Sequence, residues 1–178
     1  MPELSATGRV ILGMLTLGQR TGYDIKQFVD KTTRHFWAAS YGQIYPELRR
    51  LEEQGLVRSA DHPAGRRART VYDLTDAGRA ALEDWLRETD EPAYELRSET
   101  MLKLFFSDAV EHEYRAQWLR ALREMQERKL QALRELEPGA ASMTARGPYL
   151  SLQLGIAQTE FLIDWCSRAE ARLAQEAA

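Results

Sequence analysis

Residues 40–55 read Ser40-Tyr-Gly-Gln-Ile-Tyr-Pro-Glu-Leu-Arg-Arg-Leu-Glu-Glu-Gln-Gly55, the pattern of an amphipathic helix with its own start and stop. Ser40 and Gln43 have the spacing of a capping box, and Gly55 supplies a C-terminal stop. The stripe that this helix is predicted to bury consists of Ile44, Leu48 and Leu51.

The start of this helix depends on Pro46. If Ser40 is the N-cap, Pro46 lies beyond the first turn and removes one helical hydrogen bond. If the helix begins near Gln43, Pro46 falls within the first turn. The sequence leaves both starts open.

The neighbouring segments predict a mainly α fold with a small β-hairpin wing. Upstream, Ser5–Leu17 is apolar on more than one face, which indicates a doubly buried helix or, alternatively, a short buried strand. Thr21 then begins a second amphipathic helix. Downstream, residues 56–59 and 70–74 are β-rich runs around a Pro/Gly loop, and Thr75 caps a fourth helix. This element order is that of a winged helix-turn-helix domain.

The chain is predicted to divide near residue 90. Residues 1–90 would form the winged helix-turn-helix domain, and residues 91–178 an α-helical dimerisation domain. The polar stretch 87–94, with Pro92 near its centre, has the composition of a hinge between helices.

Two long helices are expected in the second half, after a shorter one over Leu96–Phe106. The first covers Glu111–Leu136 and is expected to end at Pro138-Gly139. The second covers Pro148–Ala174 and carries two apolar stripes, Leu154, Ala157, Phe161 and Trp165 on one side and Leu162, Cys166, Ala169 and Leu173 on the other. The preceding helix can cover one stripe, so the other predicts a homodimer.

Composition narrows the class of protein. The chain has 178 residues, 44% of them hydrophobic and 29% charged, and a net charge of −3. Such a chain can bury a core, and it is not a generally basic nucleic-acid coat. Its longest apolar run, Val10–Leu17, is far shorter than the ~20 residues of a membrane span, and no signal peptide is visible. We expect a cytoplasmic protein with no membrane partner.

Positive charge is concentrated around the predicted helix-turn-helix. Residues 20–70 contain ten Lys or Arg and six Asp or Glu, a local excess of four positive charges within a negative chain. Neutralising phosphates supplies much of the free energy of DNA binding. The local excess therefore favours double-stranded DNA as a partner.

Two groups of side chains are candidate DNA contacts. Arg66, Arg67 and Arg69 at the hairpin tip suit phosphates or a narrow minor groove, although an Arg-rich loop can simply be solvated. In the third helix, Gln43 could read adenine or only cap the helix, and Tyr45 could instead pack beneath it. The predicted contacts of the second and third helices are Thr21, Tyr23, Lys26, Ser40, Tyr41, Gln43, Tyr45 and Arg49.

The sequence offers no signal of an enzyme. The three histidines are scattered, and nucleotide-binding and hydrolase motifs are missing. Cys166 is the only cysteine, which excludes an intrachain disulfide and a Cys-based zinc site, and its apolar stripe predicts a buried structural thiol. We predict no catalytic residues, no metal and no cofactor.

A small aromatic ligand is a third expected partner. Phe36 and Trp37 lie in a connecting segment close to Tyr41, and they could line a pocket for a flat apolar effector. Arg34 or His35 would then be its polar anchor. In the alternative interpretation, Trp37 plugs the core between helices.

Several motifs resemble the PadR-like transcriptional regulators, over nearly the whole chain. Leu102-Lys-Leu-Phe-Phe106 is similar to the start of the C-terminal helical domain in the longer subfamily, and Gln43 stands where Ser is commoner. The other motifs are Ile11-Leu-Gly-Met-Leu15, Thr21-Gly-Tyr-Asp-Ile25, Gly42-Gln-Ile-Tyr-Pro-Glu-Leu-Arg-Arg-Leu-Glu52, Gln54-Gly-Leu-Val57 and Tyr72-Asp-Leu-Thr-Asp-Ala-Gly78.

The resemblance implies a homodimeric winged-helix repressor that a small, often aromatic, effector releases from DNA. A two-fold dimer would place two recognition helices on one face of DNA, so the expected operator is an inverted repeat. The alternatives are a protein-interaction adaptor or a small enzyme that uses the aromatic pocket.

Overall fold

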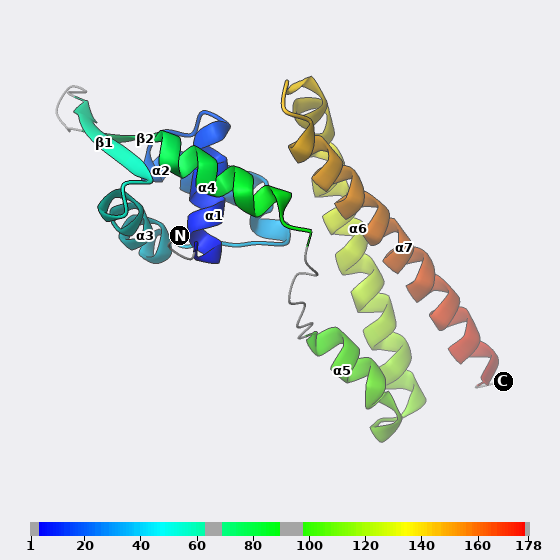
Figure 1. The fold of residues 1–178 in the computed structure, drawn as a ribbon. Coiled ribbons are helices and arrows are strands. Elements are labelled where there is room, and N and C mark those ends of the chain that lie inside the picture. Colours follow the sequence, from blue (N-terminus) through cyan, green and yellow to red (C-terminus); the bar gives the residue numbers. More distant parts are fainter. Residues whose placement is uncertain (1–3, 63–68, 90–97, 177–178) are drawn as a thin grey trace. The chain divides into compact units, whose positions relative to one another are not determined.

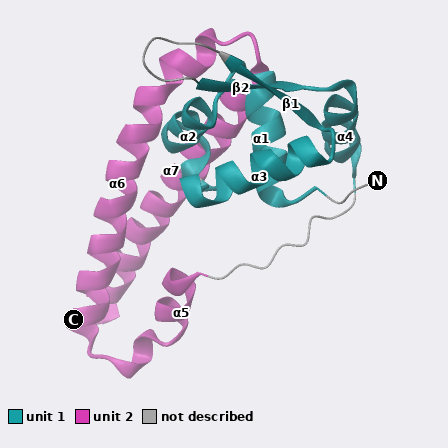
Figure 2. Cartoon of the chain, turned by 90° about the vertical axis from the view of Figure 1, so that its left-hand side faces the viewer, with its two compact units in different colours: residues 1–92 teal, residues 93–178 magenta. Residues whose placement is uncertain are grey.

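The computed structural model describes residues 4–62, 69–89 and 98–176. The chain forms two compact units, Met1–Pro92 and Ala93–Ala178, coloured separately in Figure 2. Arg66, Arg67 and the predicted hinge over Pro92 lie outside the described residues, as does the side chain of His35.

The first unit begins with three helices and a short 3₁₀ turn. Ser5 and Thr21 cap the first two helices, because their side-chain oxygens accept hydrogen bonds from the backbone N–H of Gly8 and Asp24 at 2.9 and 3.0 Å. The segment Ser5–Leu17 is therefore helical rather than a strand. The elements are α1 (Ala6–Thr16), α2 (Gly22–Lys31), η1 (Thr33–His35) and α3 (Tyr41–Glu53).

A two-stranded hairpin and a fourth helix complete this unit (Figure 1). Strand β1 (Val57–His62) pairs antiparallel with β2 (Arg69–Leu74), with Val57 opposite Leu74. Gly55, at φ +71°, provides the left-handed residue that turns the chain from α3 into β1. Thr75 caps α4 (Asp76–Arg87) by accepting from the N–H of Gly78 at 3.0 Å.

The core of the first unit comes from the stripes that the sequence predicts. Ile44, Leu48 and Leu51 on α3 have no exposed surface. They pack with residues of the other elements, including Ile11, Leu12, Ile25, Val29 and Val57. Burial of these apolar side chains stabilises the unit by roughly 1.5–3 kcal/mol for each large side chain. The predicted mainly α fold with a hairpin wing is confirmed.

The second unit is an antiparallel helical hairpin preceded by a short helix (Figure 1). His112 Nε2 donates to the carbonyl oxygen of Leu173 at 2.6 Å, near the open end of the hairpin. Arg123 and Arg134 each donate to a glutamate of the opposite helix, at 2.8 and 2.7 Å. The elements are α5 (Glu99–Phe105), η2 (Ser107–Ala109), α6 (His112–Ser142) and α7 (Arg146–Glu176).

The expected end of α6 at Pro138-Gly139 is wrong, because the helix continues to Ser142. Pro138 removes only the hydrogen bond to the carbonyl of Arg134. The two alanines after Gly139 are strong helix formers, and Ser142 Oγ donates to the Gly139 carbonyl at 2.8 Å. One missing bond therefore does not end a helix of this length.

The two stripes of α7 have different surroundings. Cys166 is fully buried, and its neighbours Leu162, Ala169 and Leu173 are partly buried. Burial also raises the pKa of the Cys166 thiol, as expected for a structural cysteine. By contrast, Leu154 and Phe161 of the other stripe are 60% and 62% exposed.

None of the helices in the described ranges combines the length and the apolar character that crossing a bilayer requires.

Candidate nucleic-acid interface

The start of α3 is Tyr41, with Ser40 as its N-cap. Pro46 lies inside the helix and leaves the carbonyl of Gly42 without its intrahelical N–H partner. The sequence left two possible starts for this helix, and the structure has the earlier one, directly after Ser40.

Gln43 is engaged in the capping of α3. Its Oε1 accepts hydrogen bonds from the backbone N–H of Ser40 at 2.9 Å and from the Ser40 hydroxyl at 3.1 Å. This geometry is that of the capping interaction predicted from the sequence. The Gln43 side chain is thus turned back along its own helix rather than outward.

The N-terminal half of α3 presents two tyrosines to solvent. Tyr41 and Tyr45 are 42% and 43% exposed, and their rings stack with centroids 6.1 Å apart. Tyr45 lies against Gly22 at the start of α2, where a Cβ atom would come within 2.7 Å of its ring. Tyr45 is thus held at the α2–α3 contact and still keeps much of its surface free.

The start of α2 adds polar groups beside these tyrosines. Lys26 pairs with Asp30, and its Nζ lies 5.4 Å from the centroid of the Tyr41 ring. Tyr23 is 54% exposed, and its hydroxyl accepts a hydrogen bond from Gln27 at 2.9 Å. The structure therefore brings together the predicted residues of α2 and α3, including Thr21 through its cap on α2.

Two of the predicted arginines lie in described elements of the first unit. Arg49 is exposed on α3, and Arg69 is exposed at the first position of β2. Glu52 at the end of α3 accepts a hydrogen bond from the backbone N–H of Ser59 at 3.0 Å and so links α3 to β1. This hydrogen bond holds α3 and the β1–β2 hairpin together within the first unit.

Glu47 is a positioning residue that sequence reasoning missed. It accepts hydrogen bonds from Arg50 at 2.8 and 3.0 Å and from the hydroxyl of Ser5, the N-cap of α1. Burial alone would raise the pKa of Glu47, but the bonds from Arg50 and Ser5 outweigh it and lower the pKa. The spacing of Glu47 and Arg50 signals their pair, whereas the contact with Ser5 spans 42 positions and has no local signal.

The predicted effector residues lie at the surface. Phe36 is 67% exposed and Trp37 is 46% exposed, so Trp37 does not plug the core. Arg34 is exposed as well, and the Tyr41 ring stacks on Tyr45. These residues follow one another from η1 into α3.

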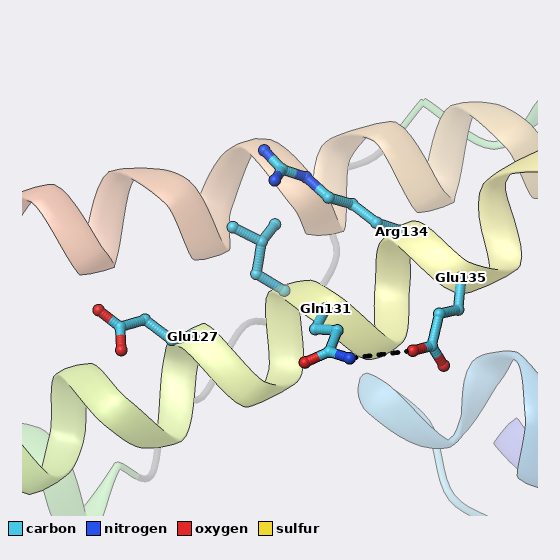
Figure 3. Close-up of a pocket in the computed structure, with 5 residues that line it drawn as sticks. Glu127, Gln131, Arg134 and Glu135 are labelled. Carbon is cyan, nitrogen blue, oxygen red and sulfur yellow. Dashed lines mark hydrogen bonds between the residues drawn. The ribbon is translucent and has the colours of Figure 1, made fainter.

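One depression is lined by α6 alone (Figure 3). Its polar groups already have partners, since Gln131 donates to Glu135 at 3.2 Å and Arg134 donates to Glu160 at 2.7 Å. Within the described residues, no three His, Cys, Asp or Glu side chains converge on a potential metal position. The tyrosine- and cation-bearing face of α2 and α3 is therefore the stronger candidate site.

Comparison with known proteins shows which families the two parts of the chain resemble. Residues 11–84, which include α2, α3 and the hairpin, match the family model of the PadR-like transcriptional regulators. The first unit therefore contains a PadR-like domain. Residues 96–174 match a second family model, named for the C-terminal part of virulence activator alpha. The predicted PadR-like resemblance, including the longer type with a C-terminal helical domain, is confirmed.

Two relatives of known structure cover almost the whole chain. The negative transcriptional regulator PadR of Bacillus subtilis is 28% identical over 164 residues, which are 87% of this chain and 90% of PadR. A crystal structure of that PadR with operator DNA has a TM-score of 0.85 at 27% identity and covers 93% of this chain and 97% of the other. A second, with p-coumaric acid, has a TM-score of 0.78, with the same identity and coverage.

The second relative is the Vibrio cholerae virulence activator AphA. Its structure has a TM-score of 0.72 at 28% identity and covers 96% of this chain and 99% of AphA. The PadR-like fold thus extends over both units, and the predicted winged helix with C-terminal helices is confirmed.

Proposed function

We propose that this PadR-like regulator is a cytoplasmic, homodimeric repressor that binds an inverted-repeat operator in double-stranded DNA. The observation that carries the proposal is the exposed surface at the N-termini of α2 and α3, where Lys26, Tyr41 and Tyr45 adjoin. A recognition helix contacts base edges with its N-terminal residues, and such a surface meets that requirement. The operator-bound PadR structure supports DNA as the partner.

The proposed contacts divide into two classes. Lys26, Arg49 and Arg69 would neutralise phosphates together with Arg66 and Arg67, and the hydroxyls of Thr21, Tyr23, Ser40, Tyr41 and Tyr45 would hold the backbone. Gln43 is the candidate for reading a base. Because Gln43 Oε1 is occupied by Ser40, base reading would require this side chain to leave the cap.

The homodimer is proposed to form through the exposed part of one stripe of α7, from Leu154 to Phe161; Trp165, at the end of this stripe, is partly buried and lies outside the proposed interface. Leu154 and Phe161 lie on this stripe, whereas α6 covers the stripe that contains Cys166. A contiguous apolar face of this kind on a soluble protein marks an interface. Two-fold symmetry then gives two recognition helices and an inverted repeat. Light scattering should report about twice 20.4 kDa.

A small aromatic effector is proposed to release the repressor from DNA. The PadR structure with p-coumaric acid supports this class of ligand. We place the site at Phe36, Trp37 and Tyr41, with Arg34 or His35 as the polar anchor. Since Tyr41 begins α3 and stacks on Tyr45, a ligand there would bind two arrangements of the helix with different affinity.

The wing is tested by the triple change Arg66→Ala, Arg67→Ala and Arg69→Ala. Because phosphate contacts are independent of sequence, binding should weaken on specific and unrelated DNA alike. The slope of log affinity against log salt should fall by about one unit for each lost contact. Fluorescence anisotropy at several salt concentrations measures both effects. An unchanged slope would remove the wing from the interface.

The effector site is tested by Trp37→Ala. Because nearly half of the Trp37 surface is already exposed, this variant should fold and bind DNA as the wild type does. We expect p-coumaric acid to release the wild type from its operator and to leave the variant bound, as followed by anisotropy. If p-coumaric acid releases both proteins equally, Trp37 has no part in the effector site.

A further inference from the structure

A cavity lies at the open end of the α6–α7 hairpin, entirely within the second unit. Its volume is about 390 Å³, within the range of roughly 300–1,000 Å³ typical of small-molecule sites. Leu104 and Ser107 from α5 and η2 line one side, and the first turns of α6 and the last turns of α7 line the others. Three segments therefore surround it, in contrast to the depression formed by α6 alone.

Two tryptophans supply flat apolar walls to this cavity. Trp118 of α6 and Trp165 of α7 are both partly buried, and the buried Leu119 contributes apolar surface beside them. Indole faces favour planar aromatic groups, and such contacts contribute beyond simple area burial. The apolar part of the lining thus selects a flat ring system.

The polar part of the lining is positively charged. Three arginines and one glutamate, Glu176, line the cavity. Arg115 Nη1 donates to the exposed Asp108 at 2.9 Å, whereas its Nε is buried and has no acceptor among the described residues. Arg168 is bound to Asp164 at 2.9 Å, and Arg172 is an exposed residue of the lining. A buried donor without an acceptor is costly, and an anion in the cavity would supply one.

We propose that this cavity is a binding site for a flat aromatic carboxylate. The ring would lie between Trp118 and Trp165, and the carboxylate would accept hydrogen bonds from the guanidinium groups of Arg115 and Arg172. Guanidinium matches carboxylate in a bidentate geometry. The proposal depends only on the second unit, and it adds a site distinct from the proposed one at Trp37.

Binding here would connect α5 to the α6–α7 hairpin. Leu104 belongs to α5 and Ser107 to η2, so a ligand that fills the cavity contacts α5, η2 and the hairpin at once. The exposed Phe105 ends α5, and the exposed Phe106 follows it. Occupation of the cavity would therefore hold α5 and η2 against the hairpin.

The test uses the full-length protein without DNA, so that its outcome is independent of the proposed regulatory function. The probe is 2-naphthoate, and the matched neutral compound is 2-naphthalenemethanol, both measured by equilibrium dialysis. We expect wild-type protein to prefer the carboxylate. The exposed pair Arg168→Gln and Arg172→Gln removes the proposed donor Arg172 together with Arg168, the neighbouring arginine of the lining that could replace it. This variant should bind naphthoate about tenfold or more weakly, because a charge-assisted hydrogen bond contributes about 1.5–3 kcal/mol. Binding of the alcohol should change little.

Two controls locate the site. The pair Arg128→Gln and Arg146→Gln removes the same charge from exposed positions outside the cavity and should leave naphthoate binding unchanged. In a Trp37→Ala background, which removes the effector site proposed above, the Arg168/Arg172 pair should weaken naphthoate binding as it does in the wild type. The pair Trp118→Phe and Trp165→Phe should retain binding but lose the quenching of tryptophan emission by naphthoate. If the Arg168/Arg172 pair leaves naphthoate affinity unchanged in the Trp37→Ala background, the proposal is overturned.

Discussion

Gly78→Ala is expected to unfold the first unit under conditions where the wild type is folded. A Cβ atom at this position would lie 1.9 Å from the carbonyl oxygen of Leu56. That carbonyl cannot easily move, because it accepts from the N–H of Thr75 at 3.2 Å while the N–H of Leu56 donates to Leu51 at 2.9 Å. Separating α4 from this turn would open the core, so we expect a loss of about 3 kcal/mol or more.

Urea denaturation followed by far-UV circular dichroism measures the loss, and DNA binding should fail together with stability. The matched control is Gly13→Ala in α1, where a Cβ atom meets nothing within 4 Å. This control should be neutral or stabilising by about 0.4–1 kcal/mol, since alanine reduces the entropy of the unfolded chain. If the two variants unfold at the same urea concentration, the close approach of α4 to Leu56 is wrong.

The double change Leu154→Glu and Phe161→Glu is expected to convert the dimer into a monomer. Each glutamate would bring a charge into an apolar interface, at a cost of several kcal/mol. We expect the dimer dissociation constant to rise by about a thousandfold or more, equivalent to about 4 kcal/mol. Sedimentation should then report about 20.4 kDa, and affinity for the inverted repeat should fall to that of one half-site.

The control for the added negative charge is the double variant Gln153→Glu and Ser167→Glu. These positions are exposed on the same helix and lie outside the stripe of Leu154 and Phe161. This variant should remain dimeric and retain its helix content. A wild-type protein that sediments as a monomer, or a Leu154/Phe161 variant that still dimerises, would contradict the proposed interface.

Local patterns predicted the elements of the first unit well, because their caps and stripes are encoded within a few residues. The Ser40–Gln43 pair marks the start of α3, and Ile44, Leu48 and Leu51 mark its buried face. Pro138 misled the interpretation of α6, since the rule that proline ends helices does not weigh one lost bond against the turns that follow it.

Contacts between distant segments could not be predicted in this way. The hydrogen bond from Ser5 to Glu47 and the approach of Gly78 to Leu56 depend on how the helices pack. The cavity lined by Trp118 and Trp165 likewise requires α5, α6 and α7 to be in place, and each tryptophan alone is indistinguishable from a core residue. By contrast, most of the candidate DNA contacts could be proposed from the sequence, because they lie close together in the chain at the N-termini of α2 and α3.

The capping interaction of Gln43 on α3 limits how strongly this residue can discriminate between bases of the operator. Losing an N-terminal cap costs about 1 kcal/mol, while a bidentate contact between glutamine and adenine discriminates by about 1–3 kcal/mol. To reach a base, Gln43 must break its hydrogen bonds to Ser40. The free energy lost with the cap then offsets much of the discrimination between bases. The base pair opposite Gln43 would then be a degenerate position of the operator consensus, and specificity would shift to bases that other side chains of α3 reach.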